Sequence, residues 1–239
     1  MTDSPVVTGS LLFDLADRLR DRLIGAINGQ ASAEGFALHL ADGTTIGSVE
    51  VWRAEHVRIA VEVRLADPAR GLAASMLHAF TPRHSSAPHL VCDMALLGHR
   101  IVVGADLIPR TDPVDAPNWA TQVWEPLLAA RDLYLATPGV DVTSEVSARL
   151  RWLCSPWLLT TAQGFENTDA AERMLALMID QFAELSGKGG PPAEGLWADR
   201  DRRYLTELFA EATDPVWEVM SELIGAPMRD RLVSLMVDG

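Results

Sequence analysis

Apolar and polar positions follow different periods in the two halves of the chain. Leucines recur at helical spacing over residues 10–27, which predicts an amphipathic helix. From residue 36 to residue 110 the period shortens to two, which is typical of strands. The predicted strands are 36–40, 46–52, 57–65, 75–80, 89–97 and 100–107.

Two short turn signals separate these strands. Asp42-Gly43 lies between the first pair and Gly98-His99 between the last pair. Consecutive strands with short connections form antiparallel sheets, because parallel neighbours need long crossovers. The first half of the chain therefore predicts an antiparallel sheet.

The second half is mainly helical in pattern, with one further strand at 157–161 and a loop at 186–195. The predicted helices are 124–135, 144–153, 169–185, 199–212, 215–224 and 228–237. We therefore expect one α/β (α+β) domain over residues 1–239, in which helices cover an antiparallel sheet.

Charge and composition narrow the class of protein. The 20 basic and 33 acidic residues give a net charge of -13, which repels nucleic acid and anionic lipid, so neither is expected as a partner. No apolar run reaches the roughly 20 residues of a membrane helix. The N-terminus lacks the basic start and apolar core of a signal peptide. These features predict a soluble cytoplasmic protein.

Common cofactor and catalytic motifs are missing from the sequence. Cys92 and Cys154 show no paired spacing, which argues against a disulfide framework and a structural zinc site. There is no G-x-G-x-x-G, P-loop, G-x-S-x-G or H-E-x-x-H pattern. An enzyme with this sequence is expected to carry neither a nucleotide nor a metal of its own.

Three titratable residues interrupt the apolar strands: Glu62, His78 and Asp93. Burial makes a charged carboxylate costly and raises the pKa of such a group toward the range useful for proton transfer. On neighbouring strands the three side chains would line one pocket. The alternatives are a solvated strand face for Glu62, a hydrogen-bonded core histidine for His78 and a structural aspartate for Asp93.

The order of these residues resembles that in the ferredoxin-dependent bilin reductases. That family has an H-L-E strand followed by L-H-C-x-x-F-P, P-x-F-G-C-D and A-D-L-x-P. The counterparts here are VEV with Glu62, LHAFTP with His78, PHLVCD with Asp93 and ADLIP with Asp106. A second match aligns the family's D-K-T-R-R-x-L-x-x-x-F-G with residues 214–225. The matches cover roughly 57–110 and 200–237.

The resemblance implies a three-layer α/β/α sandwich with a central antiparallel sheet. It places an open-chain tetrapyrrole between the sheet and the C-terminal helices. It also implies that no cofactor is bound, that single electrons arrive from a [2Fe–2S] ferredoxin through bilin radicals, and that side chains supply the protons.

Roles follow from the resemblance residue by residue. Asp93 matches the central proton donor, His78 its hydrogen-bonding partner, Glu62 a third acid present in some members, and Asp214 an aspartate on the helical side. Asp106 is expected at the substrate. Because Pro follows it at a helix start, Asp214 is equally well placed as an N-cap.

The chain departs from the family after Asp214. The family's Lys-Thr-Arg-Arg, which helps bind substrate or ferredoxin, is Pro-Val-Trp-Glu at 215–218. Arg200, Arg202 and Arg203 are the expected substitutes, and an ordinary solvated helix face is the alternative for them.

The sequence thus predicts an oxidoreductase that reduces a linear tetrapyrrole, biliverdin or a close relative, as a monomer or homodimer. Two alternatives stay open. One is an enzyme like the red chlorophyll catabolite reductases, acting on another open tetrapyrrole. The other is a tetrapyrrole-binding protein without turnover.

Overall fold

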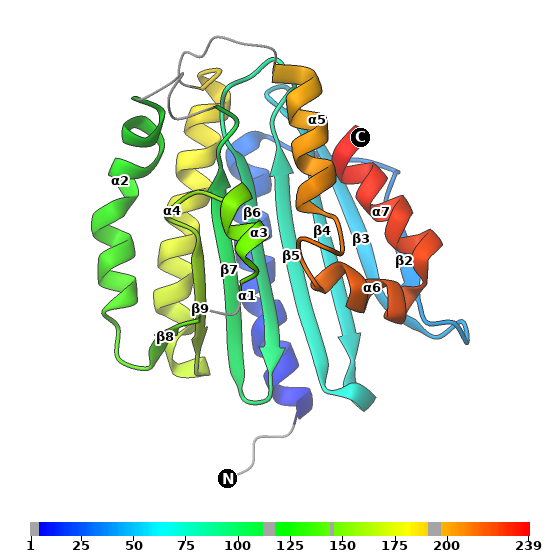
Figure 1. Cartoon of the computed structure of the whole chain (residues 1–239). Coiled ribbons are helices and arrows are strands. Elements are labelled where there is room, and N and C mark those ends of the chain that lie inside the picture. The colour runs from blue at the N-terminus through cyan, green and yellow to red at the C-terminus, as the bar shows by residue number, and fades with distance from the viewer. Residues whose placement is uncertain (1–4, 112–117, 144–145, 191–196) are drawn as a thin grey trace.

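A nine-stranded antiparallel sheet forms the middle of the molecule (Figure 1). The computed structural model describes residues 5–111, 118–143, 146–190 and 197–239. The strand order is β1-β3-β4-β5-β6-β7-β9-β8, with β2 also paired to β3. The strands are β1 Gln30–Ala31, β2 Phe36–His39, β3 Thr45–Ala54, β4 Val57–Asp67, β5 Leu72–Phe80, β6 His89–Leu97, β7 Arg100–Ile108, β8 Val140–Val142 and β9 Leu159–Gln163.

Helices cover both faces of this sheet (Figure 1). On one side, called the α1 face, lie α1 Pro5–Ile27, α2 Asn118–Leu135 and α4 Thr168–Gly187. On the other side, called the α5 face, lie α3 Ala148–Leu153, α5 Trp197–Leu208, α6 Val216–Ile224 and α7 Ala226–Asp238. Two single 3₁₀ turns occur at Pro68–Arg70 and Phe165–Asn167. The predicted three-layer α/β/α arrangement is confirmed.

Strand alternation divides the apolar residues between two cores. Leu77, Leu90 and Val103 point to the α1 face and pack against the leucines of α1 and the apolar stripe of α4. Their neighbours Met76 and Val91 point to the α5 face. Because side chains alternate across a strand, each polar residue in the sheet is assigned to one core by its position alone.

Both predicted turns are present. Gly43 adopts a φ of 86° between β2 and β3, and Gly98 adopts a φ of 63° between β6 and β7, where Leu97 pairs with Arg100. Glycine enters this left-handed region without the steric cost that a side chain imposes.

The element boundaries differ from the prediction in several places. α1 begins at Pro5, well before residue 10, and the short strands β1 and β8 were not predicted. The helix predicted at 144–153 begins at Ala148, because the Ser147 hydroxyl accepts from the Leu150 amide and caps it. Residues 144–145 of that prediction, and residues 191–195 of the predicted loop at 186–195, lie outside the described residues. The first two residues of that loop, Ser186 and Gly187, instead belong to the last turn of α4. None of the described helices is both long and apolar enough to cross a membrane.

Candidate active site

A cavity of about 530 Å³ lies between the α5 face of the sheet and the helices that cover it. Strands β5, β6, β7 and β9 form its floor, and residues of α3, α5 and α6 form its wall. Its volume lies within the range of sites for small organic ligands. Most lining side chains are apolar, and three of the polar ones are His78, Asp93 and Asp214.

His78 and Asp93 form a hydrogen-bonded pair on the cavity floor. Nε2 of His78 lies 2.7 Å from Oδ1 of Asp93. His78 is buried, whereas 48% of the Asp93 side chain is exposed, because the cavity opens above it. Nδ1 of His78 has no hydrogen-bond partner among the described residues. The hydrogen bond holds the two side chains together, and the exposed Asp93 carboxyl is presented to the cavity.

Asp214 faces this pair from the helical side. Its Oδ1 accepts from the Val216 amide at 3.1 Å, so it also caps the start of α6. Burial raises the pKa of Asp214, and the nearby charge of Asp93 raises it further. Both interpretations of this residue hold: it caps a helix and it lines the cavity.

Aromatic rings fix the histidine in place. The Phe209 ring lies nearly parallel to that of His78, at an interplanar angle of 15° and a centroid distance of 6.1 Å. Phe80 contacts both rings edge-on, and Trp217 packs against Phe209 at 5.2 Å. Opposite Asp93 on β7 stands Gly104, whose missing side chain leaves the floor open beside the carboxyl.

Glu62 does not belong to this cavity, so the expectation that three acids and bases line one pocket was wrong. Its side chain lies on the α1 face, because Val61, not Glu62, is the register partner of His78. It is 1% exposed and accepts from Nε of Arg64 at 2.7 Å and from the Ser75 hydroxyl at 3.2 Å. Burial raises the pKa of Glu62, against the effect of Arg64. Glu62 is thus a buried acid in an ion cluster, and it lies neither on a solvated strand face nor at the cavity.

The predicted substrate contact through Asp106 is also not seen, since Asp106 is fully buried and is not among the residues that line the cavity. It accepts from the Ser155 amide at 2.6 Å and from the Ser155 hydroxyl at 2.5 Å. Burial raises the pKa of Asp106 to about 6. Its place in the fold is to hold the turn between α3 and β9, from which Cys154 and Leu158 reach the cavity.

Arg200, Arg202 and Arg203 lie on another surface. They line a groove of about 710 Å³ between α5 and α7, together with Leu153 of α3. Arg202 donates to Asp238 at 2.9 Å. These arginines are exposed and do not line the cavity, so their predicted contact with a ligand there was wrong.

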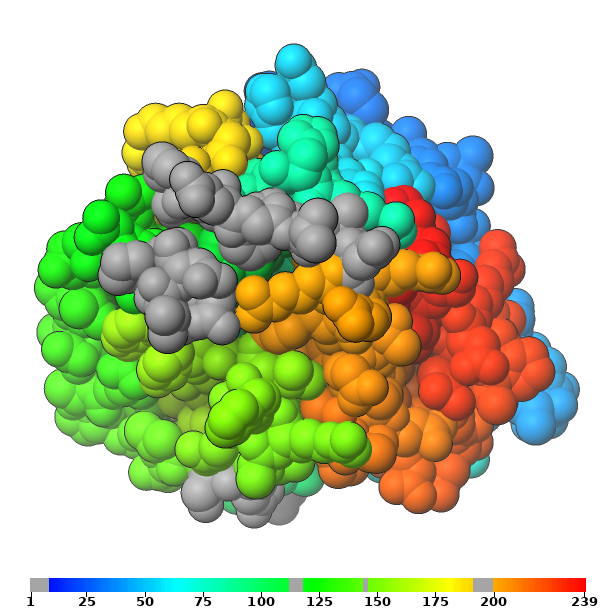
Figure 2. All heavy atoms as spheres, turned by 45° about the horizontal axis from the view of Figure 1, so that its top comes forward, coloured from blue at the N-terminus to red at the C-terminus, as the bar shows by residue number. Residues whose placement is uncertain are grey.

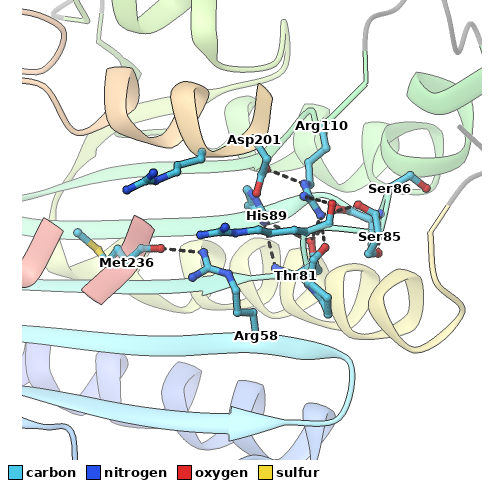
Figure 3. Close-up of polar contacts among 12 residues, drawn as sticks. Arg58, Thr81, Ser85, Ser86, His89, Arg110, Asp201 and Met236 are labelled. Atoms are coloured by element: carbon cyan, nitrogen blue, oxygen red, sulfur yellow. Dashed lines mark hydrogen bonds and ion pairs between the residues drawn. The ribbon is translucent and has the colours of Figure 1, made fainter. Parts of the chain in front are cut away.

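A buried polar network closes the end of the sheet beside the cavity (Figure 3). Nε2 of His89 bonds to Oδ1 of Asp201 at 2.9 Å, and Nε of Arg110 donates to the same oxygen at 2.9 Å. Arg110 also donates to the Thr81 hydroxyl and to the carbonyls of Pro82 and Ser85. The network ties α5, through Asp201, to the ends of β5, β6 and β7.

The hydrogen bonds of the network determine its protonation. The Thr81 amide donates to Nδ1 of His89, so this nitrogen is an acceptor and Nε2 carries the proton. Burial and the Arg110 charge lower the pKa of His89 to about 4. Burial would raise the pKa of Asp201, but His89 and Arg110 outweigh it and hold that pKa below its usual value. Beside them, Arg58 donates to the carbonyls of Met236 and Gly239.

Sequence reasoning missed this network, because 91 residues separate Arg110 from Asp201. It also missed Phe209 and Trp217 as cavity residues, whose patterns are those of ordinary core positions. No group of three or more His, Cys, Asp or Glu side chains among the described residues is arranged to hold a metal ion.

Comparisons with known proteins agree with the fold. No protein-family model matches the sequence, and no curated protein matches it. The structure is similar to the crystal structure of phytochromobilin synthase from tomato in complex with biliverdin, with a TM-score of 0.72 and 16% sequence identity. The likeness covers 92% of this chain and 80% of that one. It confirms the fold that the sequence resemblance implied.

Proposed function

We propose that this protein is a ferredoxin-dependent reductase of a linear tetrapyrrole, biliverdin or a close relative. The observation that carries the proposal is the cavity of about 530 Å³ in which His78, Asp93 and Asp214 converge. The fold is shared with a phytochromobilin synthase that binds biliverdin. Of these three residues, the two on the sheet, His78 and Asp93, both lie in segments that resemble the sequence motifs of the bilin reductases.

The proposed chemistry needs two electrons and two protons for each double bond reduced. Electrons come one at a time from a [2Fe–2S] ferredoxin, so the tetrapyrrole passes through a radical. Asp93 supplies a proton from the open side of the floor, and His78, 2.7 Å away, restores it. Asp214 contributes from the opposite wall, where its raised pKa favours the protonated, donating form.

The electron donor is expected to dock on the surface where α3 meets α5. We call this surface the basic face; it carries the exposed Arg149, Arg151, Arg200, Arg202 and Arg203. Trp152, which also belongs to α3, has 88% of its surface exposed. Figure 2 looks onto this surface, with α3 in yellow-green below α5 in orange. Leu150 of the same short helix lines the cavity, so an electron entering at α3 has little protein to cross.

Anaerobic turnover tests the proposal. Biliverdin is mixed with the protein, a plant-type ferredoxin, its reductase and NADPH, and absorbance and product chromatography follow the reaction. We expect the bilin spectrum to shift and sharpen on binding, then to convert to a reduced product. An unchanged free-bilin spectrum at excess protein contradicts the proposal.

Two variants locate the reaction. Asp93→Asn keeps the shape but cannot donate a proton, so binding is retained, reduction stalls and a radical signal persists in electron paramagnetic resonance. Gly104→Leu fills the floor beside Asp93 and is expected to weaken bilin binding by about tenfold or more. Binding without turnover in the wild-type protein favours the tetrapyrrole-binding alternative, and full turnover in Asp93→Asn removes that residue from the mechanism.

A further inference from the structure

The cavity holds a single arginine or lysine among its described lining residues, and this is Arg100. Two carboxyl groups, Asp93 and Asp214, face the same space. The chain as a whole carries a net charge of -13. An anionic ligand is therefore repelled by most of its surroundings and attracted at one point.

Arg100 has hydrogen-bonding capacity to spare. It is the first residue of β7, at the lower end of the β6–β7 hairpin in Figure 1, and its side chain is 32% exposed. Every hydrogen bond that the Arg100 side chain makes with the described residues comes from Nη2. This nitrogen donates to Oδ2 of Asp141 at 2.6 Å, to the Gly139 carbonyl at 3.4 Å and to the Ala162 carbonyl. Nε and Nη1 remain for a ligand, and a guanidinium binds a carboxylate through two such donors.

The pairing with Asp141 does not occupy the arginine strongly. The Asp141 side chain is 67% exposed, and ion pairs at the surface contribute little because water competes for both partners. A carboxylate of a ligand that is held by the cavity walls can therefore replace or share this contact.

The position along the strand sets the orientation of the ligand. Arg100 lies four residues before Gly104, the register partner of Asp93, so the two backbone positions are about 13 Å apart at the rise of a strand. The reacting part of a ligand over Asp93 then points its acidic side chains toward the β6–β7 turn. Leu97, which lines the cavity beside this turn, is 67% exposed, so this end is open to solvent.

We propose that Arg100 binds a carboxylate side chain of the tetrapyrrole and so fixes which end of the ligand reaches Asp93. This inference rests on the proposed function, because it takes the ligand to be an open-chain tetrapyrrole acid. In the segment after Asp214, where the bilin reductases carry basic residues, Trp217 is buried and packs on Phe209.

Paired ligands test this role. Biliverdin and its dimethyl ester are titrated by absorbance against the wild-type protein and Arg100→Met. The wild type is expected to bind the diacid about tenfold more tightly than the ester, and Arg100→Met to lose that preference while its ester affinity changes less than about twofold. Asp141→Asn, which removes the competing carboxylate, should tighten binding of the diacid alone by two- to threefold.

Arg22→Met is the matched control, since it removes the same charge from α1 on the other face of the sheet, where Arg22 pairs with Asp180. It should keep the wild-type preference. Equal affinity of Arg100→Met and the wild type for the diacid, or an equal loss for both ligands, overturns the inference and leaves the proposed function standing. Failure of the wild type to bind either ligand contradicts the proposed function itself, and the inference with it.

Discussion

Side chains of β4 and β5 alternate between two environments, and this alternation decides what each acid can do. Glu62 points toward α1, where Arg64 bridges it to Asp17 and Arg20 lies 3.5 Å from its second oxygen. Leu77 is the register partner of Glu62, and the next residue, His78, points into the cavity. A shift of one residue along a strand therefore separates a buried acid of the α1 face from a residue that lines the cavity.

Glu62→Gln is expected to lower the free energy of unfolding by roughly 1–3 kcal/mol, because it removes the charge that Arg64 and Arg20 face. Bilin binding and the rate of reduction should stay at wild-type levels, since the side chain lies on the far side of the sheet. Chemical denaturation and the anaerobic assay measure the two effects. A variant that folds stably but reduces biliverdin tenfold more slowly would return Glu62 to the catalytic group.

Two buried groups make opposite contributions to stability between pH 4 and pH 6.5. His89 takes up a proton near pH 6.5 when unfolded but only near pH 4 when folded, so its contribution is lost as the pH falls through this window. The pKa of Asp106 is raised from 3.8 to about 6, so its contribution is full below pH 3.8 and lost as the pH rises through 6. Each amounts to about 3 kcal/mol.

We therefore expect the wild-type unfolding free energy to change little from pH 6 to pH 4, and Asp106→Asn to lose about 2 kcal/mol over the same interval. Urea denaturation at several pH values measures both slopes. Parallel curves for the two proteins would show that Asp106 does not titrate in this range.

The sequence identified candidate site residues but did not predict correctly which of them meet. Motif order singled out His78 and Asp93, whose pairing follows from neighbouring strands. Glu62 was misplaced, because the register between β4 and β5 is set by a ladder that residue spacing alone does not reveal. The sequence did not identify Arg100 as a cavity residue, because a basic residue after a Gly-containing turn is common on protein surfaces.

Among the elements, α5 connects the network at the end of the sheet to the His78–Asp93 pair. Asp201, near its start, is held by His89 and Arg110, and Phe209, just after its end, stacks on His78. Apolar periodicity predicted this helix and most others, because amphipathic faces leave a clear pattern. The strands β1 and β8 are too short to leave one, and they are fixed by pairing with longer neighbours.

Asp201→Asn is expected to destabilise the protein by about 3–5 kcal/mol, because it leaves the buried Arg110 without its carboxylate. Hydrogen exchange should rise in α5 before it rises in β5 or β6. Glu207→Gln, an exposed change on the same helix, serves as the control and should alter neither quantity. Uniform exchange across the sheet and α5 would mean that the network stabilises the whole fold and not this helix.

At the scale of the whole molecule, charge is unevenly distributed. The chain carries -13, yet α3 and α5 expose five arginines, three of which line a groove with Glu207, Asp230 and Asp238. Plant-type ferredoxins are acidic, so the global field opposes their approach while the basic face attracts them. Which field dominates decides how the reaction responds to salt.

If the basic face docks the donor, the reduction rate should fall as salt rises above about 0.1 M, where the Debye length drops below about 10 Å. Arg149→Glu combined with Arg203→Glu should raise the KM for ferredoxin severalfold and leave bilin binding intact. Arg18→Glu combined with Arg22→Glu makes the same change of net charge on α1 and should affect the KM far less. A rate that rises with salt, together with unaffected basic-face variants, would mean that global repulsion dominates. The physiological donor would then be a less acidic ferredoxin or a flavodoxin-like protein that docks elsewhere.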